Sequence, residues 1–194
     1  MKPVRDFLVK IPKRFKDEIE LSDGSKLWLA SKYQEFHNRV TSAEVVSIPL
    51  KDNMDVSLGD TLYFHHHVVI NDGQPLTGND NNYIVRFDPK HTIGNQAIAF
   101  KCKDTGEVKP IGGWALLESV DQEDEFVSDV IEVIELNDKL PRKGRVSFDA
   151  PWLEELGVKK GDIVGFVKNA DYRIKIDGKE HYRTRTEDLL YVEK

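Results

Sequence analysis

Residues 56–64 read Val56-Ser57-Leu58-Gly59-Asp60-Thr61-Leu62-Tyr63-Phe64, and residues 158–166 read Val158-Lys159-Lys160-Gly161-Asp162-Ile163-Val164-Gly165-Phe166. Both runs place Val-x-x-Gly-Asp directly before a short run rich in apolar residues. Gly-Asp favours a tight turn, and the residues that follow it favour a β-strand. A turn-and-strand unit that occurs twice in one chain predicts two copies of one small fold.

Two further matches keep the same order along the chain. Lys2-Pro3 precedes an apolar strand in the first half, as Lys109-Pro110 does in the second. A looser match sets residues 83–100 against residues 182–192, because both contain an aromatic strand followed by a closing apolar strand. The sequence therefore predicts two domains, residues 1–105 and residues 106–194, which are split near the turn at Lys103-Asp104-Thr105-Gly106.

The fold class follows from the period of the apolar pattern. Most apolar runs are short and alternate with a period of two, and turn signals such as Asn71-Asp72-Gly73 and Asp177-Gly178 separate them. Only Pro151–Gly157 has a helical pattern, with Pro at its start and Gly at its end. We expect an all-β protein of two consecutive β-barrels with little helix.

Composition limits the class of protein. The chain has 194 residues, of which 39% are hydrophobic and 32% charged, and it carries a formal net charge of −6. That charge argues against nucleic-acid binding as the main function, because phosphate contacts need clustered Lys and Arg. No run approaches the roughly 18 apolar residues of a membrane span, and no secretion signal is evident. With a single cysteine, Cys102, a cytoplasmic protein without membrane contact is expected.

Motifs for catalysis are not found in the sequence. It contains neither the Gly-x-Ser-x-Gly of hydrolases nor the glycine-rich motifs that bind dinucleotides or nucleotide phosphates. Cys102 has no His nearby in sequence. We therefore expect no catalytic residues, no cofactor and no enzyme activity.

The series of motifs in the second half resembles the GroES (chaperonin-10) family. The matching runs are Gly144-Arg145-Val146, Val158–Val164, Ile174–Glu180 and Thr186–Val192, in the family's order and spacing. The resemblance covers nearly the whole chain as a tandem of two GroES-like domains. The first half departs from it between His65 and Tyr83, where an insertion rich in Asn, Asp and Gly, from Asn71 to Asn82, replaces a tight connection.

The resemblance implies a co-chaperonin, which caps a GroEL-type chaperonin and assists ATP-dependent folding. It also implies a ring-shaped homo-oligomer joined through N- and C-terminal strands, here Lys2–Lys10 and Leu189–Val192. Divergent members of the family occur in phages, so a phage-encoded protein in an infected bacterial cytoplasm is one interpretation. Medium-chain alcohol dehydrogenases share the barrel, but they require a nucleotide-binding domain that this sequence does not show.

The family binds its chaperonin through a mobile loop that carries an apolar tripeptide. Here the corresponding segment spans residues 15–42, with Gly24 as hinge and Leu27, Trp28 and Leu29 as the anchor. Residues 16–26 are charged and poor in packing residues, so we expect them to be mobile. The alternative is that Leu27–Leu29 is a core strand of an ordinary hairpin.

The equivalent segment of the second half begins at Asp121 and leads into Val130 and Ile131. It has no glycine hinge, and its Val/Ile and Glu alternation favours a half-buried strand over a second anchor. We therefore expect Val130 and Ile131 to contribute less to chaperonin binding than Trp28.

Two interpretations remain beside the co-chaperonin. The rival is a non-catalytic structural or adaptor protein, such as a virion or assembly component, that keeps the fold without binding a chaperonin. A small-molecule-binding barrel is supported only by the insertion. His65-His66-His67 suggests a metal, but strand alternation would put only His65 and His67 on one side, so no metal site is expected.

Overall fold

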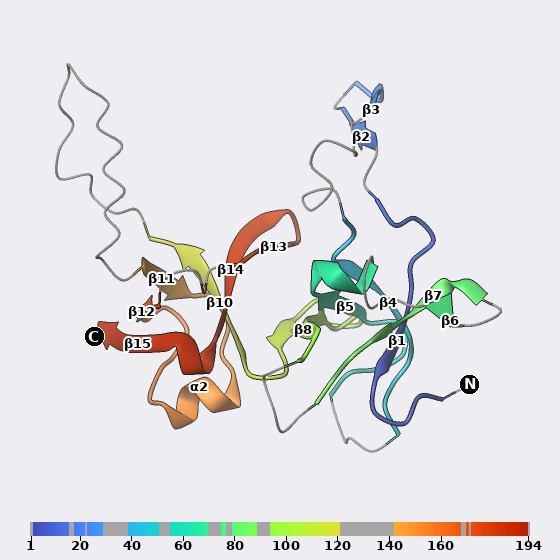
Figure 1. Ribbon diagram of the computed structural model, residues 1–194. Helices are drawn as coiled ribbons and strands as arrows, with labels where there is room; N and C mark the ends of the chain where they lie inside the picture. The colour runs from blue at the N-terminus through green and yellow to red at the C-terminus, as the bar shows by residue number, and fades with distance from the viewer. Residues whose placement is uncertain are drawn as a thin grey trace. The chain divides into compact units, whose positions relative to one another are not determined.

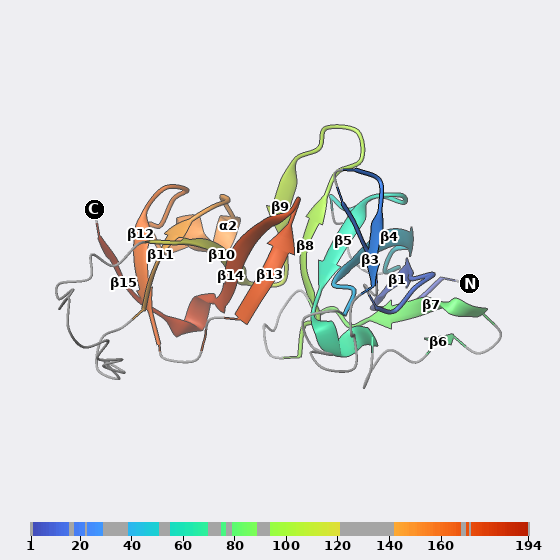
Figure 2. The same ribbon diagram turned by 90° about the horizontal axis from the view of Figure 1, so that it is seen from above.

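The computed structural model confirms the all-β class (Figures 1 and 2). It describes residues 2–15, 18–21, 23–28, 39–50, 55–69, 75–76, 79–88, 94–120, 142–167, 170 and 172–193. The chain divides into two compact units, Met1–Trp114 and Ala115–Lys194. None of the helices in the described ranges is long and apolar enough to cross a membrane.

The first unit is built on a seven-stranded sheet of order β6-β7-β1-β4-β5-β8-β9. A separate two-stranded hairpin, β2-β3, is inserted between β1 and β4 in sequence, and the short 3-10 helix η1 follows β5. The elements are β1 (Phe7–Lys10), β2 (Glu18–Glu20), β3 (Lys26–Trp28), β4 (Ser42–Ser47), β5 (Thr61–Phe64), η1 (His66–Val69), β6 (Pro75–Leu76), β7 (Asn79–Val85), β8 (Ala97–Lys101) and β9 (Val108–Pro110).

The second unit is built on a six-stranded sheet of order β13-β14-β10-β11-β12-β15. Its elements are β10 (Trp114–Ser119), β11 (Arg142–Val146), α2 (Pro151–Glu155), β12 (Ile163–Phe166), β13 (Tyr172–Ile176), β14 (Lys179–Arg185), the 3-10 helix η2 (Thr186–Asp188) and β15 (Leu189–Glu193). Strand for strand, this order repeats the first six strands of the other sheet. The two sheets therefore share one topology over six strands, whereas the tandem of two family domains stays a prediction.

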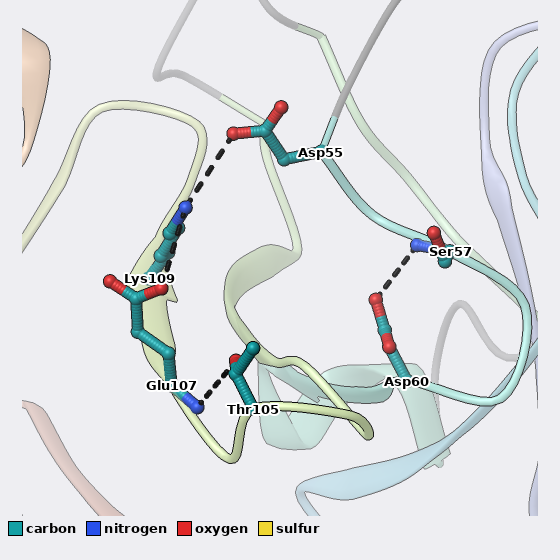
Figure 3. A network of polar contacts seen from close by, with 6 residues as sticks. All are labelled: Asp55, Ser57, Asp60, Thr105, Glu107 and Lys109. Carbon is teal, nitrogen blue, oxygen red and sulfur yellow. Dashed lines mark hydrogen bonds and ion pairs between the residues drawn. The ribbon is translucent and has the colours of Figure 1, made fainter.

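The repeated Val-x-x-Gly-Asp forms the same turn in both units. Gly59 and Gly161 have positive φ angles of 87° and 94°, a conformation that glycine adopts without steric cost. The Asp60 carboxylate accepts the Ser57 N–H at 2.7 Å, as Figure 3 shows, and the Asp162 carboxylate accepts the equivalent Lys159 N–H at 2.9 Å. Each turn glycine also donates its N–H to the preceding strand, Gly59 to the Val45 carbonyl and Gly161 to the Val146 carbonyl, both at 2.9 Å.

The strands after the two turns pair in the same register. In β5 and β8, Thr61 faces Lys101, Tyr63 faces Ala99, and a bulge then brings Phe64 opposite Ala97. In β12 and β15, Ile163 faces Glu193, Gly165 faces Tyr191, and a bulge at the same point brings Phe166 opposite Leu189. β8 and β15 therefore hold equivalent places, down to the irregularity in their pairing.

Each unit has its own apolar core, as expected for a domain that folds around inward-facing strand residues. In the first unit the core includes Phe7, Val9, Leu62, Phe64 and Val85. In the second it includes Leu117, Val146, Leu153, Val164 and Phe166. The predicted helix is present as α2, with Pro at its start and Leu153 buried.

The sheet of the first unit extends beyond the equivalent of the second by one strand. β9 adds to the free side of β8, with Pro110 opposite Ala99 and Lys109 opposite Phe100. Lys109 also lies within ion-pair distance of Asp55, at 3.8 Å (Figure 3). The chain therefore passes the expected boundary after residue 105 while still paired with the first sheet. That boundary stays a prediction.

Candidate functional site

The segment between β1 and β4 begins and ends at one place in the first unit. Phe15 and Arg39 form an isolated antiparallel bridge, and Val40 donates its N–H to the Arg14 carbonyl at 3.1 Å. These contacts close the base of the segment predicted to carry the anchor. The described residues 18–21 and 23–28 therefore belong to a segment whose two ends meet just before β4.

Above this base, β2 and β3 pair as a short hairpin, with Ile19 opposite Leu27 and Glu18 opposite Trp28. The turn is closed by the Leu21 N–H, which donates to the Ser25 carbonyl at 2.8 Å. Gly24 has a φ of 81°, which suits the predicted hinge position to glycine. The described part of residues 16–26 thus has the form of a hairpin, and the mobility expected of this segment stays a prediction.

Glu18 of β2 forms ion pairs with Lys26 of β3 and with Lys13, which precedes the hairpin. The Glu18 carboxylate lies 3.1 Å from the Lys26 ammonium and 3.4 Å from that of Lys13. The hydrogen bond from Lys26, followed by the one from Lys13, lowers the pKa of Glu18. Exposed pairs of this kind contribute little to stability. They do not supply a core for the hairpin.

The apolar side chains of β3 face solvent. Leu27 is 52% exposed and Trp28 is 71% exposed, the largest exposure among the large hydrophobic residues that the structure describes. Neighbouring residues of a strand point to opposite faces, so each face of the hairpin carries one of these side chains. The alternative of a buried core strand is therefore wrong for Leu27 and Trp28. Leu29 lies outside the described residues.

The second unit has an equivalent segment between β10 and β11. These strands pair with Leu117 opposite Val146, so the segment leaves and rejoins the sheet at the position that β1 and β4 define in the first unit. Val130 and Ile131 lie outside the described residues. Their weaker role remains a prediction.

The three histidines do not lie on one strand, so the strand alternation expected for them is wrong. β5 ends at Phe64, and the chain turns at once into η1, so His66 and His67 belong to a 3-10 helix. A 3-10 turn does not send neighbouring side chains to opposite faces of a sheet. One nitrogen from each of the three imidazoles lies within 4.8 Å of the other two.

Sequence reasoning named the terminal strands but not the difference between the two equivalent strand edges. β8 is covered by β9 and its first four residues are buried, whereas β15 ends its sheet and Leu190 is 56% exposed. The repeated Lys-Pro could have indicated this difference. Lys109-Pro110 lies in β9, which covers β8, and Lys2-Pro3 is its counterpart in sequence.

Comparison with known proteins gives two relatives of the same name. The chain is 32% identical to "Co-chaperonin GroES" of Coprothermobacter proteolyticus over 93 residues, which cover 94% of that protein and 44% of this chain. It is 33% identical to "Co-chaperonin GroES" of Halalkalibacterium halodurans over 92 residues, which cover 97% of that protein and 44% of this chain. No family model matches. Nearly a whole relative therefore corresponds to less than half of this chain.

Proposed function

The chain belongs to the GroES co-chaperonin family, and we propose on that basis that it is a tandem co-chaperonin that caps a GroEL-type chaperonin ring. In this role it assists ATP-dependent protein folding in a bacterial or phage-infected cytoplasm. It performs no catalysis and needs no cofactor of its own.

The tandem arrangement is supported by the length of the match and by the topology. A nearly complete relative aligns with 44% of the chain, and two sheets with the same strand order are available to accommodate it. The tandem arrangement is also supported by local detail. Both units have the same hydrogen bond in the Val-x-x-Gly-Asp turn and the same bulge in the strand pair that follows.

The observation that carries the chaperonin contact is the exposure of Leu27 and Trp28 on a hairpin with a closed base. Large apolar groups in water are costly to expose and favourable to bury, and Trp is enriched among the residues that dominate interfaces. We assign the anchor to Leu27, Trp28 and Leu29, with Gly24 in the turn that presents them.

One hairpin of this kind gives a weak contact. An anchoring aromatic side chain contributes about 2 kcal/mol or more when fully buried, and ordering the rest of the segment removes part of that gain. Several copies held in one assembly would bind tightly through effective concentration. Such a lid attaches firmly as a whole and still releases one contact at a time.

Among the described residues no strand covers the outer edge of β15, and this open edge supports assembly of several chains. The covered edge of β8 shows how such an edge is filled: Ile111 donates its N–H to the Ile98 carbonyl at 2.9 Å, and both side chains are buried. The counterparts by repeat are Val4 and Leu190, which are 55% and 56% exposed. We therefore place residues Lys2–Val4 of a second copy on β15, antiparallel to it, with Val4 opposite Leu190.

The backbone of the N-terminal segment is compatible with this pairing. Pro110 lacks an N–H, and it lies opposite Ala99 at a position between the hydrogen-bonded pairs of β8 and β9. Pro3 would hold the same position opposite Tyr191, and its carbonyl already accepts the Leu50 N–H at 3.2 Å. The new strand pair therefore needs neither an N–H at Pro3, which proline lacks, nor the Pro3 carbonyl.

A refolding assay tests the function. A chaperonin-dependent substrate is refolded with a GroEL-type chaperonin and ATP, with and without this protein, and the proposal expects a higher yield with it. Leu27→Ala should reduce the gain, whereas Leu58→Ala, at a matched exposure of 53% in the repeated turn, should not.

Absence of stimulation and of binding with every matched chaperonin would contradict the proposal. That outcome would favour the structural or adaptor protein, which keeps the fold but does not contact a chaperonin.

A further inference from the structure

The three consecutive histidines form a compact cluster at the end of β5. Their ring centroids are 4.3 Å apart in all three pairs, so the imidazoles stand as the corners of a nearly equilateral triangle. Each of the three residues is half-buried. Among the described residues this is the group of His, Cys, Asp or Glu whose ligand atoms converge closely enough for one ion.

The backbone holds the cluster in place from both sides. The His65 N–H donates to the Gln96 carbonyl at 2.8 Å, and the Val68 N–H donates to the His65 carbonyl at 3.0 Å. Val68 and Val69, which follow in η1, are buried in the core of the first unit. The histidines therefore stand on a rigid corner of the fold, which keeps the entropic cost of bringing three ligands together low.

We propose that His65, His66 and His67 form a binding site for a borderline divalent cation such as Zn²⁺. Imidazole nitrogen is a preferred ligand of Zn²⁺, Ni²⁺ and Cu²⁺, and three protein ligands leave a fourth position for water or a group of another molecule. This site is independent of the hairpin that carries Leu27 and Trp28.

Metal binding requires the side chains to adjust. Metal–nitrogen bonds of about 2.0–2.1 Å in a tetrahedral site put ligand atoms about 3.4 Å apart. The nitrogens lie within 4.8 Å of one another, but His65 and His66 are stacked with their planes 29° apart. Because a metal lies in the plane of each imidazole that binds it, these two rings must rotate out of the stack for both to reach one ion.

One hydrogen bond engages Nδ1 of His65 within the cluster. The His67 N–H donates to His65 Nδ1 at 3.1 Å, so this nitrogen carries a lone pair that points back into the cluster. A cation would take that lone pair in place of the N–H. Because His67 is only half-buried, water can accept the N–H that is released.

Calorimetric titration of the full chain with ZnCl₂ at pH 7.5 tests the site. One equivalent of Zn²⁺ should bind, and His66→Ala and His67→Ala should each weaken binding by at least about tenfold, since loss of even an outer partner of a metal site costs 10–100-fold. Zn²⁺ should also raise the melting temperature of the wild-type chain by several degrees and that of His66→Ala by much less.

The controls separate this cluster from other metal ligands. His181→Gln, in the second unit, and Cys102→Ser should bind Zn²⁺ as the wild type does. Lack of any binding heat, or binding that His66→Ala and His67→Ala both leave unchanged, would overturn the proposal. Circular dichroism of each variant verifies that it is folded, and the two single variants guard against one that fails to fold.

Discussion

Asp60 and Asp162 close the two copies of the same turn, but their surroundings differ. Asp60 is 1% exposed and accepts a second backbone N–H, from Lys103 at 3.0 Å, besides that of Ser57. Asp162 is half-buried and accepts the Lys159 N–H. A buried amide that loses its acceptor costs more than one that water can reach.

We therefore expect Asp60→Ala to destabilise its unit by about 3 kcal/mol and Asp162→Ala to destabilise its unit by about 1 kcal/mol. Urea denaturation followed by circular dichroism measures both. Asp60→Asn, which keeps an acceptor oxygen, should lose less than Asp60→Ala. Equal losses for the two alanine variants would contradict the difference in burial.

His181 makes stability depend on pH. It is 4% exposed, and burial lowers its pKa below the usual value of 6.5 even though Glu118 lies nearby. The unfolded chain then binds a proton more readily than the folded one. Stability should therefore be complete above about pH 6.5, fall as the pH drops below that value, and level off below the pKa of the folded state.

The comparison of wild type with His181→Gln isolates this effect, because both chains keep the other histidines. Urea midpoints at pH 7.5 and pH 5.0 should show a larger loss for the wild type. A variant that loses as much as the wild type would show that other groups cause the pH dependence.

At the scale of elements, the two segments that follow the first strand of each unit are predicted to be unequal. The first presents Trp28 on the exposed hairpin β2-β3 (Figure 1). The second holds Val130 and Ile131, whose sequence pattern favours a half-buried strand. A chaperonin contact would then rest on one hairpin per chain.

Trp28→Ala should weaken capture of the protein by an immobilised chaperonin with nucleotide by about thirtyfold for each contact, which corresponds to about 2 kcal/mol. Ile131→Ala should have a much smaller effect in the same pull-down. Comparable losses for the two variants would remove the asymmetry and give both segments a role in binding.

At the scale of the whole molecule, the equivalent strands β8 and β15 differ in whether another strand covers them. This difference predicts how chains join. The β8 edge is filled by β9 from the same chain, and the β15 edge ends its sheet with Leu190 exposed. Unpaired edges readily accept another strand. If each chain offers its N-terminal segment to the β15 of the next, the contact is head-to-tail, and it forms the expected ring when the rotation between neighbouring chains closes.

Light scattering measures this assembly directly. The wild type should exceed the 22.2 kDa of one chain severalfold, and Val4→Glu and Leu190→Glu should each shift it toward the monomer. Leu156→Glu, at a similar exposure of 58% beyond α2, serves as the control and should leave the assembly intact. A wild type that is monomeric at high concentration would exclude the β15 joint.

Local chemistry explains what could be predicted from sequence. The turn at Gly59-Asp60 and its copy at Gly161-Asp162 depend on a glycine with positive φ and on a carboxylate three residues from the N–H it accepts. Both requirements involve residues that are close together in the sequence. The same holds for α2, with Pro at its start, and for the period-two strands, so the all-β class and the repeat were accessible without coordinates.

The state of the candidate sites depends instead on residues far apart in the chain. Trp28 is exposed because the hairpin packs no core against it, His66 meets its neighbours because the chain bends into η1 at Phe64, and Leu190 is open where Ile98 is covered. Sequence by itself determined the all-β class, the two Val-x-x-Gly-Asp turns and the strands that follow them. Only the tertiary structure decided which apolar groups and edges remain uncovered, because burial is a property of all the elements that meet at a position.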